Sequence, residues 1–343
     1  MQLIICDREF QRLGMIETAS VIWMSRYYDL GDFEILVAMD QKRYELLHKD
    51  YYVLRYDDPY VGIIEDINIT DDGETEYLKV TGRFAESLLT RRIVYNQTQV
   101  SGTVENGLIA LIKDNITDPK ISARKIDIIG ISPLKGFHEK LNAQYTGDEI
   151  AEVVTAVCQA NGLGYRMPLI DDRFMFEIYK GTDRSYAQDE NPHIVFSDKN
   201  DNLISSTYTE VNSKHKNFAL VAGEGEGAQR RKLPVGTLEG IDRKETFVDA
   251  RDISSNEGEV SDIEYDKALM ERGYEKLSET AMTQAFDGEV SMNVNYQYRK
   301  DYQLGDIVTI ENERWGISIN SRIIEVMESE DENGYIVTPT FGA

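Results

Sequence analysis

Apolar and polar residues alternate with a period of two over most of the first hundred residues, and this period predicts β-strands. We expect strands over residues 1–6, 21–24, 33–38, 51–56, 61–70 and 74–82. Asp71-Asp72-Gly73 separates the last two runs, and Asp-Gly between β-type runs is a strong hairpin signal. A helical pattern over 84–92 follows. Residues 1–95 are therefore predicted to form a first β-barrel-like domain capped by one helix.

From about residue 96 the spacing of apolar residues changes to that of amphipathic helices. One helix is expected over residues 102–115, with apolar residues on a single face: Val104, Leu108, Leu111 and Ile112. A second helix is expected to start at Thr146-Gly147-Asp148-Glu149, which has the spacing of a capping box, and to end at Asn161-Gly162. With strands over 164–167 and 173–179, residues 96–200 read as a lateral α+β domain.

Beyond residue 200 the period returns to that of strands. Strands are expected over 205–211, 217–222, 289–298, 307–311, 314–319, 322–328 and 335–339, with a hairpin turn at Asn333-Gly334. Residues 225–260 are rich in Gly, Glu and Asp and read as irregular, and a helix is predicted over 263–284. Residues 201–343 therefore read as a second β-barrel-like domain, interrupted by a helix-bearing insertion at about 225–285.

The predicted fold class is α+β and β-rich, with two β-barrel-like domains and lateral helix-containing α/β domains. A length of 343 residues is sufficient for two or three domains. Apolar residues make up 41% of the chain, which is ordinary for a globular protein. No apolar run approaches the roughly 20 residues that span a bilayer. The N-terminus lacks the basic segment of a signal peptide, so we expect synthesis and folding in a cytoplasm.

The charge is unusual, because 37 Lys and Arg face 61 Asp and Glu and the net charge is -24. Such a chain repels phosphate backbones, which argues against nucleic-acid binding through a basic patch. The acids serve solubility in one interpretation. In another, some of them line a passage that DNA crosses without sticking, and composition does not separate the two.

The residues that bind metals are scattered along the chain. Two cysteines, Cys6 and Cys158, lie far apart and outside any Cys-x-x-Cys motif, which favours buried reduced thiols over a disulfide. The four histidines form neither a His-Glu-x-x-His motif nor an i,i+4 pair: His48, His138, His193 and His215. We predict no metal site and no cofactor.

Three segments resemble ligand-binding motifs, but each is better explained as a turn, a hairpin or a surface loop. Gly223-Glu224-Gly225-Glu226-Gly227 lacks the Lys of a phosphate-binding loop and carries two acids, so a flexible turn is preferred. The segment from Asp66 to Gly73 fails the calcium-loop register and reads as a hairpin. Arg230-Arg231-Lys232 is a short basic cluster among acids and reads as a solvated loop or an interface contact.

Catalytic signatures are also missing from the sequence. There is no Gly-x-Ser-x-Gly motif, and no Cys or Ser stands with a His in a known catalytic pattern. Carboxylate pairs for glycoside hydrolysis carry no specificity in so acidic a chain. The 20 tyrosines could stack on carbohydrate or single-stranded DNA, but tyrosine-rich strands and subunit interfaces are the preferred explanation. We predict no catalytic, cofactor-binding or metal-binding residues, and a protein that is not an enzyme.

A series of short signatures is more informative than any of these segments. In order they are Gly181-Thr182-Asp183-Arg184, Val195-Phe196-Ser197, Val221 to Gly227, Arg243-Lys244-Glu245 and Val248 to Asp252. Further pieces surround Trp23, Tyr28 to Glu34, Gly82 to Ile93, and Tyr302 to Val308 with its Leu304-Gly305-Asp306 turn. Together they resemble the tail-hub and tail-tip proteins of long-tailed bacteriophages of Gram-positive hosts, which are similar to the trimeric baseplate hub of contractile phages.

The resemblance implies a structural, homotrimeric protein of the virion tail tip. Two β-barrel-like domains per subunit would give a trimer six similar units, which would fit the sixfold tail tube. The ring would join the tube to the tip and surround the channel for the tape-measure protein and DNA. The implied partners are therefore other copies of the chain, the distal tail or tube ring, the tape-measure protein and other tail-tip or receptor-binding proteins.

Two alternatives remain open. One is a carbohydrate-binding or cell-wall-degrading tail protein, and the other is a component of a phage-derived contractile device in a bacterium. The chain ends at Ala343 without a C-terminal fibre or peptidase-like extension. We therefore expect cell-wall degradation and receptor binding to belong to other tail-tip proteins.

Overall fold

The computed structural model describes residues 1–71, 73–290 and 296–342. The chain divides into two compact units, each built from segments that are distant in sequence. The β unit comprises Met1–Ser87, Gly164–Thr209 and Ala285–Ala343, and the α/β unit comprises Leu88–Leu163 and Glu210–Gln284. These boundaries differ from the sequence-based divisions at 95/96 and 200/201, because the strands that follow residue 163 return to the first unit.

The N-terminal part of the β unit contains seven strands and one short helix. The strands are β1 (Leu3–Cys6), β2 (Arg12–Ile16), β3 (Ser20–Arg26), β4 (Asp32–Ala38), β5 (Tyr52–Arg55), β6 (Val61–Asp71) and β7 (Glu76–Phe84). Helix α1 (Gln41–Leu46) follows β4, and the short 3-10 helix η1 (Ala85–Arg91) replaces the helix expected over 84–92. The sequence pattern missed β2 and α1, because β2 buries only Ile16 and α1 buries no residue.

The rest of the β unit comes from the middle and the end of the chain. Its strands are β11 (Gly164–Arg166), β12 (Leu169–Ile170), β13 (Arg173–Tyr179), β14 (Val195–Ser197), β15 (Leu203–Val211), β19 (Thr283–Val290), β20 (Ile307–Asn312), β21 (Ile317–Asp331) and β22 (Gly334–Gly342). The separate strands expected over 314–319 and 322–328 form the single strand β21. Part of the strand expected over 289–298, and Asp72 of the β6–β7 turn, lie outside the described residues.

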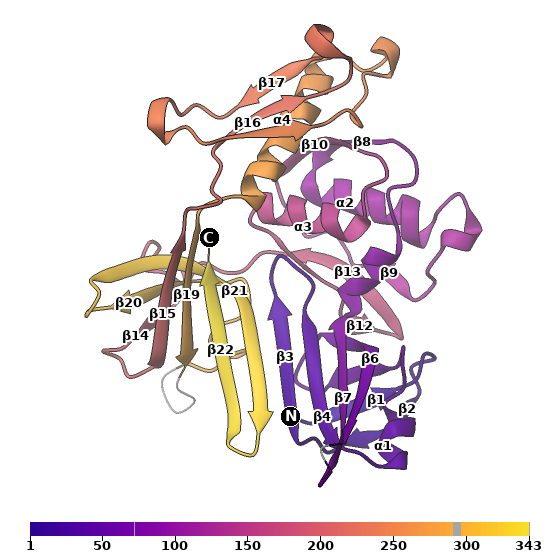
Figure 1. The fold of residues 1–343 in the computed structure, drawn as a ribbon, viewed down its shortest axis with the longest axis vertical. Coiled ribbons are helices and arrows are strands. Elements are labelled where there is room, and N and C mark those ends of the chain that lie inside the picture. Colours follow the sequence, from indigo (N-terminus) through magenta and orange to yellow (C-terminus); the bar gives the residue numbers. More distant parts are fainter. Residues whose placement is uncertain (72, 291–295, 343) are drawn as a thin grey trace. The chain divides into compact units, whose positions relative to one another are not determined.

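A single hydrogen-bonded sheet joins the two ends of the chain. Its order is β15-β19-β22-β21-β3-β4-β7-β6-β5-β1-β2, with β20 beside β21 and β14 beside β20. Strands β3 and β21 are antiparallel, with Met24 opposite Met327 and Trp23 opposite Glu328, and they lie side by side in Figure 1. Among the described residues this strand path runs from β15 to β2 without closing, so two closed barrels are not seen.

One hydrophobic core serves the whole β unit. Trp23, Phe33 and Phe84 pack in the N-terminal part, with the Trp23 and Phe84 ring centroids 4.6 Å apart. Phe196 and Phe341 belong to the same cluster, with centroids 5.3 Å apart. Large aromatic side chains in such contacts dominate the burial energy of a core. Residues of both β regions therefore share one hydrophobic cluster.

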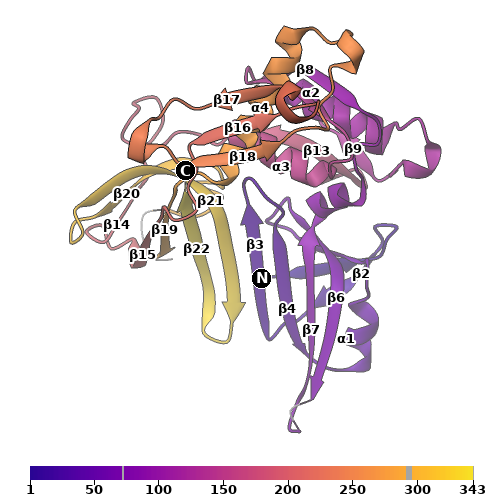
Figure 2. The ribbon, with the colours of Figure 1, turned by 45° about the horizontal axis from the view of Figure 1, so that its top comes forward.

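The α/β unit packs helices against two small sheets. Its strands are β8 (Thr98–Thr103), β9 (Ile129–Ile131), β10 (Lys140–Tyr145), β16 (Phe218–Ala222), β17 (Lys232–Val235) and β18 (Glu245–Asp249), and its helices are α2 (Val104–Ile112), α3 (Ile150–Ala160) and α4 (Asp262–Glu279). A π-helical turn (Lys113–Thr117) extends α2, and four 3-10 turns cover Ser122–Arg124, Gly227–Gln229, Gly240–Asp242 and Asn256–Gly258. β16 lies between β17 and β18, and α4 packs against this sheet (Figure 2).

Three sequence-based expectations for the α/β unit are wrong in detail. Residues 225–260 are not wholly irregular, because β17 and β18 pair with β16. Helix α4 ends at Glu279 rather than at 284, and β19 follows. The capping box lies at Ser261 and Glu264 of α4, whereas α3 begins at Ile150 and Glu149 makes no side-chain cap.

Competing backbone contacts explain why Thr146 does not cap a helix. Gly147 has a φ of 83° and donates its N–H to the carbonyl of Val94 at 2.8 Å. The Asp148 carboxylate accepts the Thr146 N–H at 2.9 Å, and the Asp148 carbonyl accepts the Val94 N–H. The segment therefore docks on residues 92–94, and the helix starts only after it. The contacts of a segment distant in sequence override a local capping signal.

Candidate functional site

The signature Gly181-Thr182-Asp183-Arg184 interlocks with the Leu304-Gly305-Asp306 turn. The carboxylate of Asp306, which is 3% exposed, accepts the Thr182 N–H at 2.7 Å and Arg184 Nε at 2.9 Å. A Cβ on Gly181 would lie 1.9 Å from the carbonyl oxygen of Gly305, so only glycine fits there. The two signatures therefore form one structural feature, although 120 residues separate them.

The Val195-Phe196-Ser197 signature belongs to the same feature. It forms β14, which pairs in parallel with β20, placing Val195 opposite Thr309. Ile307 donates its N–H to the carbonyl of Thr182 at 3.0 Å. These contacts position the start of β20 in the sheet, so the role of this half of the signature series is to build the β unit.

A buried cluster of charged side chains lies where β3 meets β21. Glu328, fully buried on β21, accepts from both terminal nitrogens of Arg55 at 3.1 Å and from Arg299 at 2.9 Å. Asp58 accepts Trp23 Nε1 at 2.9 Å and pairs with Arg299. Five side chains from four segments therefore satisfy one another; Trp23, Arg55, Asp58 and Glu328 are buried, and the Arg299 side chain is 22% exposed.

The carboxylates of this cluster have opposite pKa shifts. Burial raises the pKa of Asp58, and this effect outweighs the neighbouring positive charges of Arg299 and Arg55. Burial also opposes ionisation of Glu328, but the hydrogen bonds and charges of Arg299 and Arg55 outweigh it and lower the pKa of Glu328. Glu328 is therefore the ionised centre of the cluster, which pairs regions more than 270 residues apart.

The Gly223 to Gly227 segment is a loop held by the protein itself. Glu224 accepts the Ser255 N–H at 3.1 Å and the Ser254 hydroxyl at 3.0 Å, while its own N–H donates to the Tyr265 hydroxyl at 2.8 Å. A Cβ on Gly223 would lie 2.1 Å from that hydroxyl oxygen. The loop is therefore a turn fixed by internal partners, where the sequence predicts a flexible turn.

The basic cluster at residues 230–232 is paired with acids of the same unit. Arg230 bonds to Asp249, and Arg231 bonds to Asp266 with its Nη2 2.5 Å from an Asp266 oxygen. Hydrogen bonds from Arg251 first, and then from Arg230, lower the pKa of Asp249 to about 2. The signatures at 221–227 and 248–252 therefore meet around one exposed ionic network, which closes the β16–β18 end of the α/β unit.

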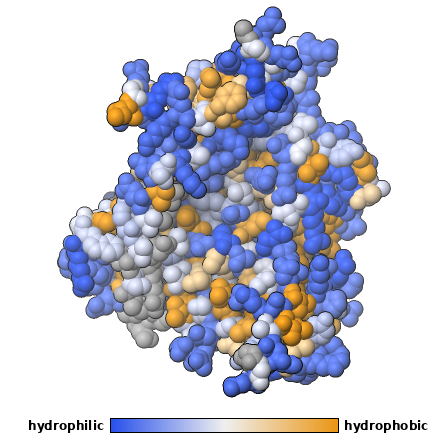
Figure 3. All heavy atoms as spheres, in the orientation of Figure 1, coloured by the Kyte–Doolittle hydropathy of each residue, from blue (hydrophilic) through white to orange (hydrophobic). Residues whose placement is uncertain are grey.

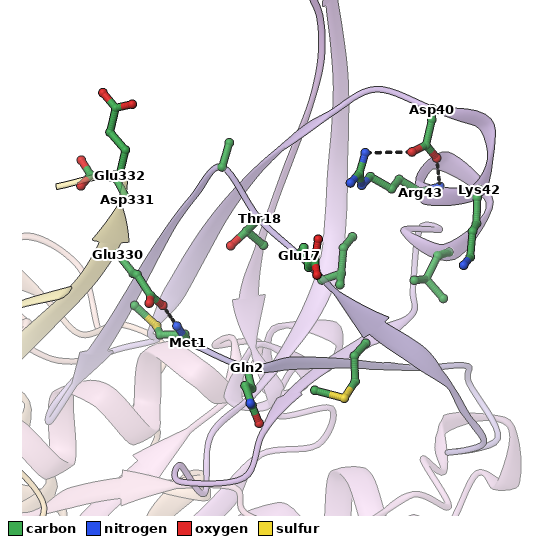
Figure 4. A pocket seen from close by; sticks show the side chains of 14 residues that line it. Met1, Gln2, Glu17, Thr18, Asp40, Lys42, Arg43, Glu330, Asp331 and Glu332 are labelled. Carbon is green, nitrogen blue, oxygen red and sulfur yellow. Dashed lines mark hydrogen bonds and ion pairs between the residues drawn. The ribbon is translucent and has the colours of Figure 1, made fainter. Parts of the chain in front are cut away.

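A groove of ≈ 1050 Å³ lies beside the N-terminus in the β unit (Figure 4). Arg43 pairs with Asp40 at 2.8 Å on one side, and the Met1 amino group pairs with Glu330 on the other. The same groove has apolar lining from Met15, Ile16 and Leu46. Sequence reasoning did not identify this groove, because its lining comes from β2, α1 and the β21–β22 hairpin, and only folding brings these together.

Residues 2–343 match the family of siphovirus ReqiPepy6 Gp37-like proteins. The chain belongs to this family. The resemblance to siphophage tail proteins that the signatures predict is confirmed. No functionally curated protein matches the sequence.

Solved structures of tail proteins share the fold of this family member. The 43 kDa tail protein of prophage MuSo2 from Shewanella oneidensis is 12% identical, with a TM-score of 0.62 over 99% of this chain and 98% of that one. A tail protein from Neisseria meningitidis MC58 is 12% identical, with a TM-score of 0.59 over 100% and 96%. Prophage tail protein gp18 from Listeria monocytogenes EGD-e is 12% identical, with a TM-score of 0.54 over 99% and 94%.

The structure also bears on the two cysteines and on the residues that could bind a metal ion. Cys6 and Cys158 are both buried, as the sequence predicts, and unpaired, and burial raises the pKa of each. Across residues 1–71, 73–290 and 296–342, no cluster of three or more His, Cys, Asp and Glu could hold a metal ion. The Asp66 to Asp71 segment forms strand β6, with Asp66 opposite Thr81, rather than a calcium loop.

One face of this Gp37-like protein is largely polar. On the face in Figure 3, hydrophilic side chains predominate and hydrophobic ones form small separate groups. Helices in the described part of the chain are too short or too polar to cross a membrane.

Proposed function

We propose that this chain is a non-enzymatic tail-hub protein of the virion, placed at the tail tip as a homotrimeric ring. In this role the ring joins the sixfold tail tube to the tip and surrounds the channel for the tape-measure protein and DNA. Membership of a siphovirus family and the fold shared with tail proteins support this proposal. The proposal is further supported by the continuous sheet, which holds the two β regions of each chain together.

A repeated signature favours two related β regions in each chain. Tyr28-Asp29-Leu30-Gly31-Asp32 runs into the start of β4, and Tyr302-Gln303-Leu304-Gly305-Asp306 directly precedes β20. Both have the form Tyr-x-Leu-Gly-Asp. In each, the final aspartate accepts from an arginine, Arg26 at 2.5 Å in the first and Arg184 at 2.9 Å in the second. Three chains with two such regions each would present six similar strand starts, which suits a sixfold partner.

The proposal is tested by the mass of the purified protein in solution across a concentration series, alone and with the tail-tube protein. The expected result is a species of three chain masses, or a concentration-dependent approach to it. A strict monomer under both conditions would contradict the proposal. Digestion of purified cell walls by the protein would instead favour the enzymatic alternative.

The charge of the ring gives a second test. With a net charge of -24, we propose that acidic side chains face the channel and keep DNA from adhering. Electron cryomicroscopy of the trimer measures this directly, and a neutral or basic channel would overturn this part of the proposal while leaving the ring intact.

A further inference from the structure

The α/β unit holds a polar pocket of ≈ 280 Å³. It lies between the start of β8, the π-helical turn after α2 and the loop that follows. Single-turn π-helices occur frequently at functional sites. The lining side chains are aromatic, amide and charged: Tyr95, Asn96, Gln97, Gln99, Asp114, Asp118, Lys120 and Arg124, among others.

Buried amides hold one wall of this pocket in place. Gln97 and Gln99 flank Thr98 at the start of β8, and both side chains contact the same buried amide. Gln144, which is 2% exposed, accepts from Gln97 at 2.6 Å and donates to Gln99 at 3.2 Å. The two amides in the pocket are therefore oriented before any ligand arrives.

A second buried amide holds the Tyr95 backbone and the Arg124 side chain that lies against the Tyr95 ring. Asn115, which is 3% exposed, accepts the Tyr95 N–H at 3.0 Å and Arg124 Nη1 at 3.2 Å. The Arg124 guanidinium carbon lies 4.6 Å from the Tyr95 ring centroid, and Tyr95 is still 53% exposed. The tyrosine is thus an aromatic platform that is supported by a cation and open to solvent.

The charges in the pocket balance. Asp114 and Asp118 supply two carboxylates, and none of the hydrogen bonds or ion pairs between described side chains engages them. Lys120 and Arg124 supply two positive charges. A neutral pocket in a chain of net charge -24 does not favour a phosphate group.

We propose that this pocket binds a single residue of a neutral sugar, as a binding site separate from assembly. Amide and carboxylate side chains match hydroxyl groups that both donate and accept hydrogen bonds. The exposed tyrosine ring packs against the C–H face of a sugar ring. The volume is below that of sites for drug-sized ligands, which limits the occupant to about one ring.

Saturation-transfer-difference NMR on the full chain tests this site. The probes are the methyl glycosides of glucose, galactose, N-acetylglucosamine and rhamnose, together with the corresponding sugar phosphates and a purified neutral cell-wall polysaccharide. We expect at least one neutral glycoside to bind, with Tyr95→Ala weakening its affinity about tenfold or more. Asp118→Asn, which keeps the shape of the side chain, should also weaken binding.

Tyr56→Ala is the matched control. Tyr56 is 68% exposed and lies beside Arg12, with 5.7 Å between the guanidinium carbon and the ring centroid, but it is outside the pocket. The Tyr56→Ala variant should bind the neutral glycoside with the same affinity as the unaltered protein. Binding by no neutral sugar, equal binding by Tyr95→Ala, or a preference for sugar phosphates would each overturn the proposal. If Tyr95→Ala instead abolishes contact with another tail protein and no sugar binds, the pocket is a protein interface. None of these outcomes bears on the trimer.

Discussion

Two arginine–carboxylate pairs, one in each unit, lie in different environments. In the β unit, Arg55 and Glu328 are 5% and 0% exposed and tie together segments from opposite ends of the chain. In the α/β unit, Arg251 and Asp249 pair at 2.7 Å with side chains 68% and 41% exposed, two residues apart. A buried charge that loses its partner is strongly destabilising, whereas an exposed pair contributes little. The sheet of the β unit therefore depends on its ion cluster, and the loops of the α/β unit do not depend on theirs.

Removing the central acid of the β unit should have the largest effect. Glu328→Ala leaves Arg55 and Arg299 without their shared partner in the core, and we expect the free energy of unfolding to fall by about 3–5 kcal/mol. Denaturant titration followed by the fluorescence of Trp23, which is fully buried beside Arg55, measures it. Glu313→Ala is the control, because Glu313 is 64% exposed and pairs with an exposed lysine. A loss in Glu328→Ala as small as in this control would remove the contrast between buried and exposed ion pairs.

The stability of the β unit should also depend on pH through Glu86. This side chain is 2% exposed and accepts the Met167 N–H at 2.8 Å. Burial raises its pKa from 4.5 to about 7, with Asp58 adding to the shift and Arg166 opposing it. The folded protein thus keeps a proton that the unfolded chain releases above about pH 4.5. The stability that this retained proton contributes is fully present below that pH and is lost as the pH rises through about 7.

Glu86→Gln should flatten that pH dependence. The change in the free energy of unfolding due to Glu86 between pH 4.5 and 7.5 is at most about 3 kcal/mol. Thermal unfolding of both proteins across this range measures the difference, with Gln retaining the acceptor for Met167. An unchanged slope in the variant would mean that other groups set the pH dependence.

Filling the interlocked turn should have an intermediate effect. Gly181→Ala places a Cβ 1.9 Å from the Gly305 carbonyl oxygen, and the backbone must shift at a cost of about 1–3 kcal/mol. Gly14→Ala is the matched control, because its Cβ would meet only Leu46 at an ordinary 3.8 Å. The midpoints of denaturant unfolding should separate the two variants. Equal midpoints would show that the turn adjusts freely.

The smallest effect should come from the helix cap of the α/β unit. Ser261→Ala removes the side chain that accepts the Glu264 N–H at 3.3 Å, and should lower the free energy of unfolding by about 1 kcal/mol. Thr146→Ala, at the capping box suggested by sequence, should change it by less than about 0.5 kcal/mol. If the two results were reversed, the helix start at Ile150 would be in error.

Local patterns predicted elements more reliably than the arrangement of those elements. The β6–β7 hairpin, helix α2 and the end of α3 at Asn161 follow their local signals. β17 and β18 were missed because each is short and stable only beside β16. The polar pocket was missed because its walls are ordered by Asn115 and Gln144, whose partners are distant in the chain and show no spacing signal.

The sequence alone determined the family, the β-rich character and the absence of a recognisable catalytic motif, because these depend on residue types and short spacings. The tertiary structure alone decided that strands from the two ends of the chain share one sheet and one core. Pairing of β3 with β21 is fixed by burial of Trp23 and by satisfaction of Glu328, Arg55 and Arg299. Such contacts join residues hundreds of positions apart, and their energy exists only once the chain has folded.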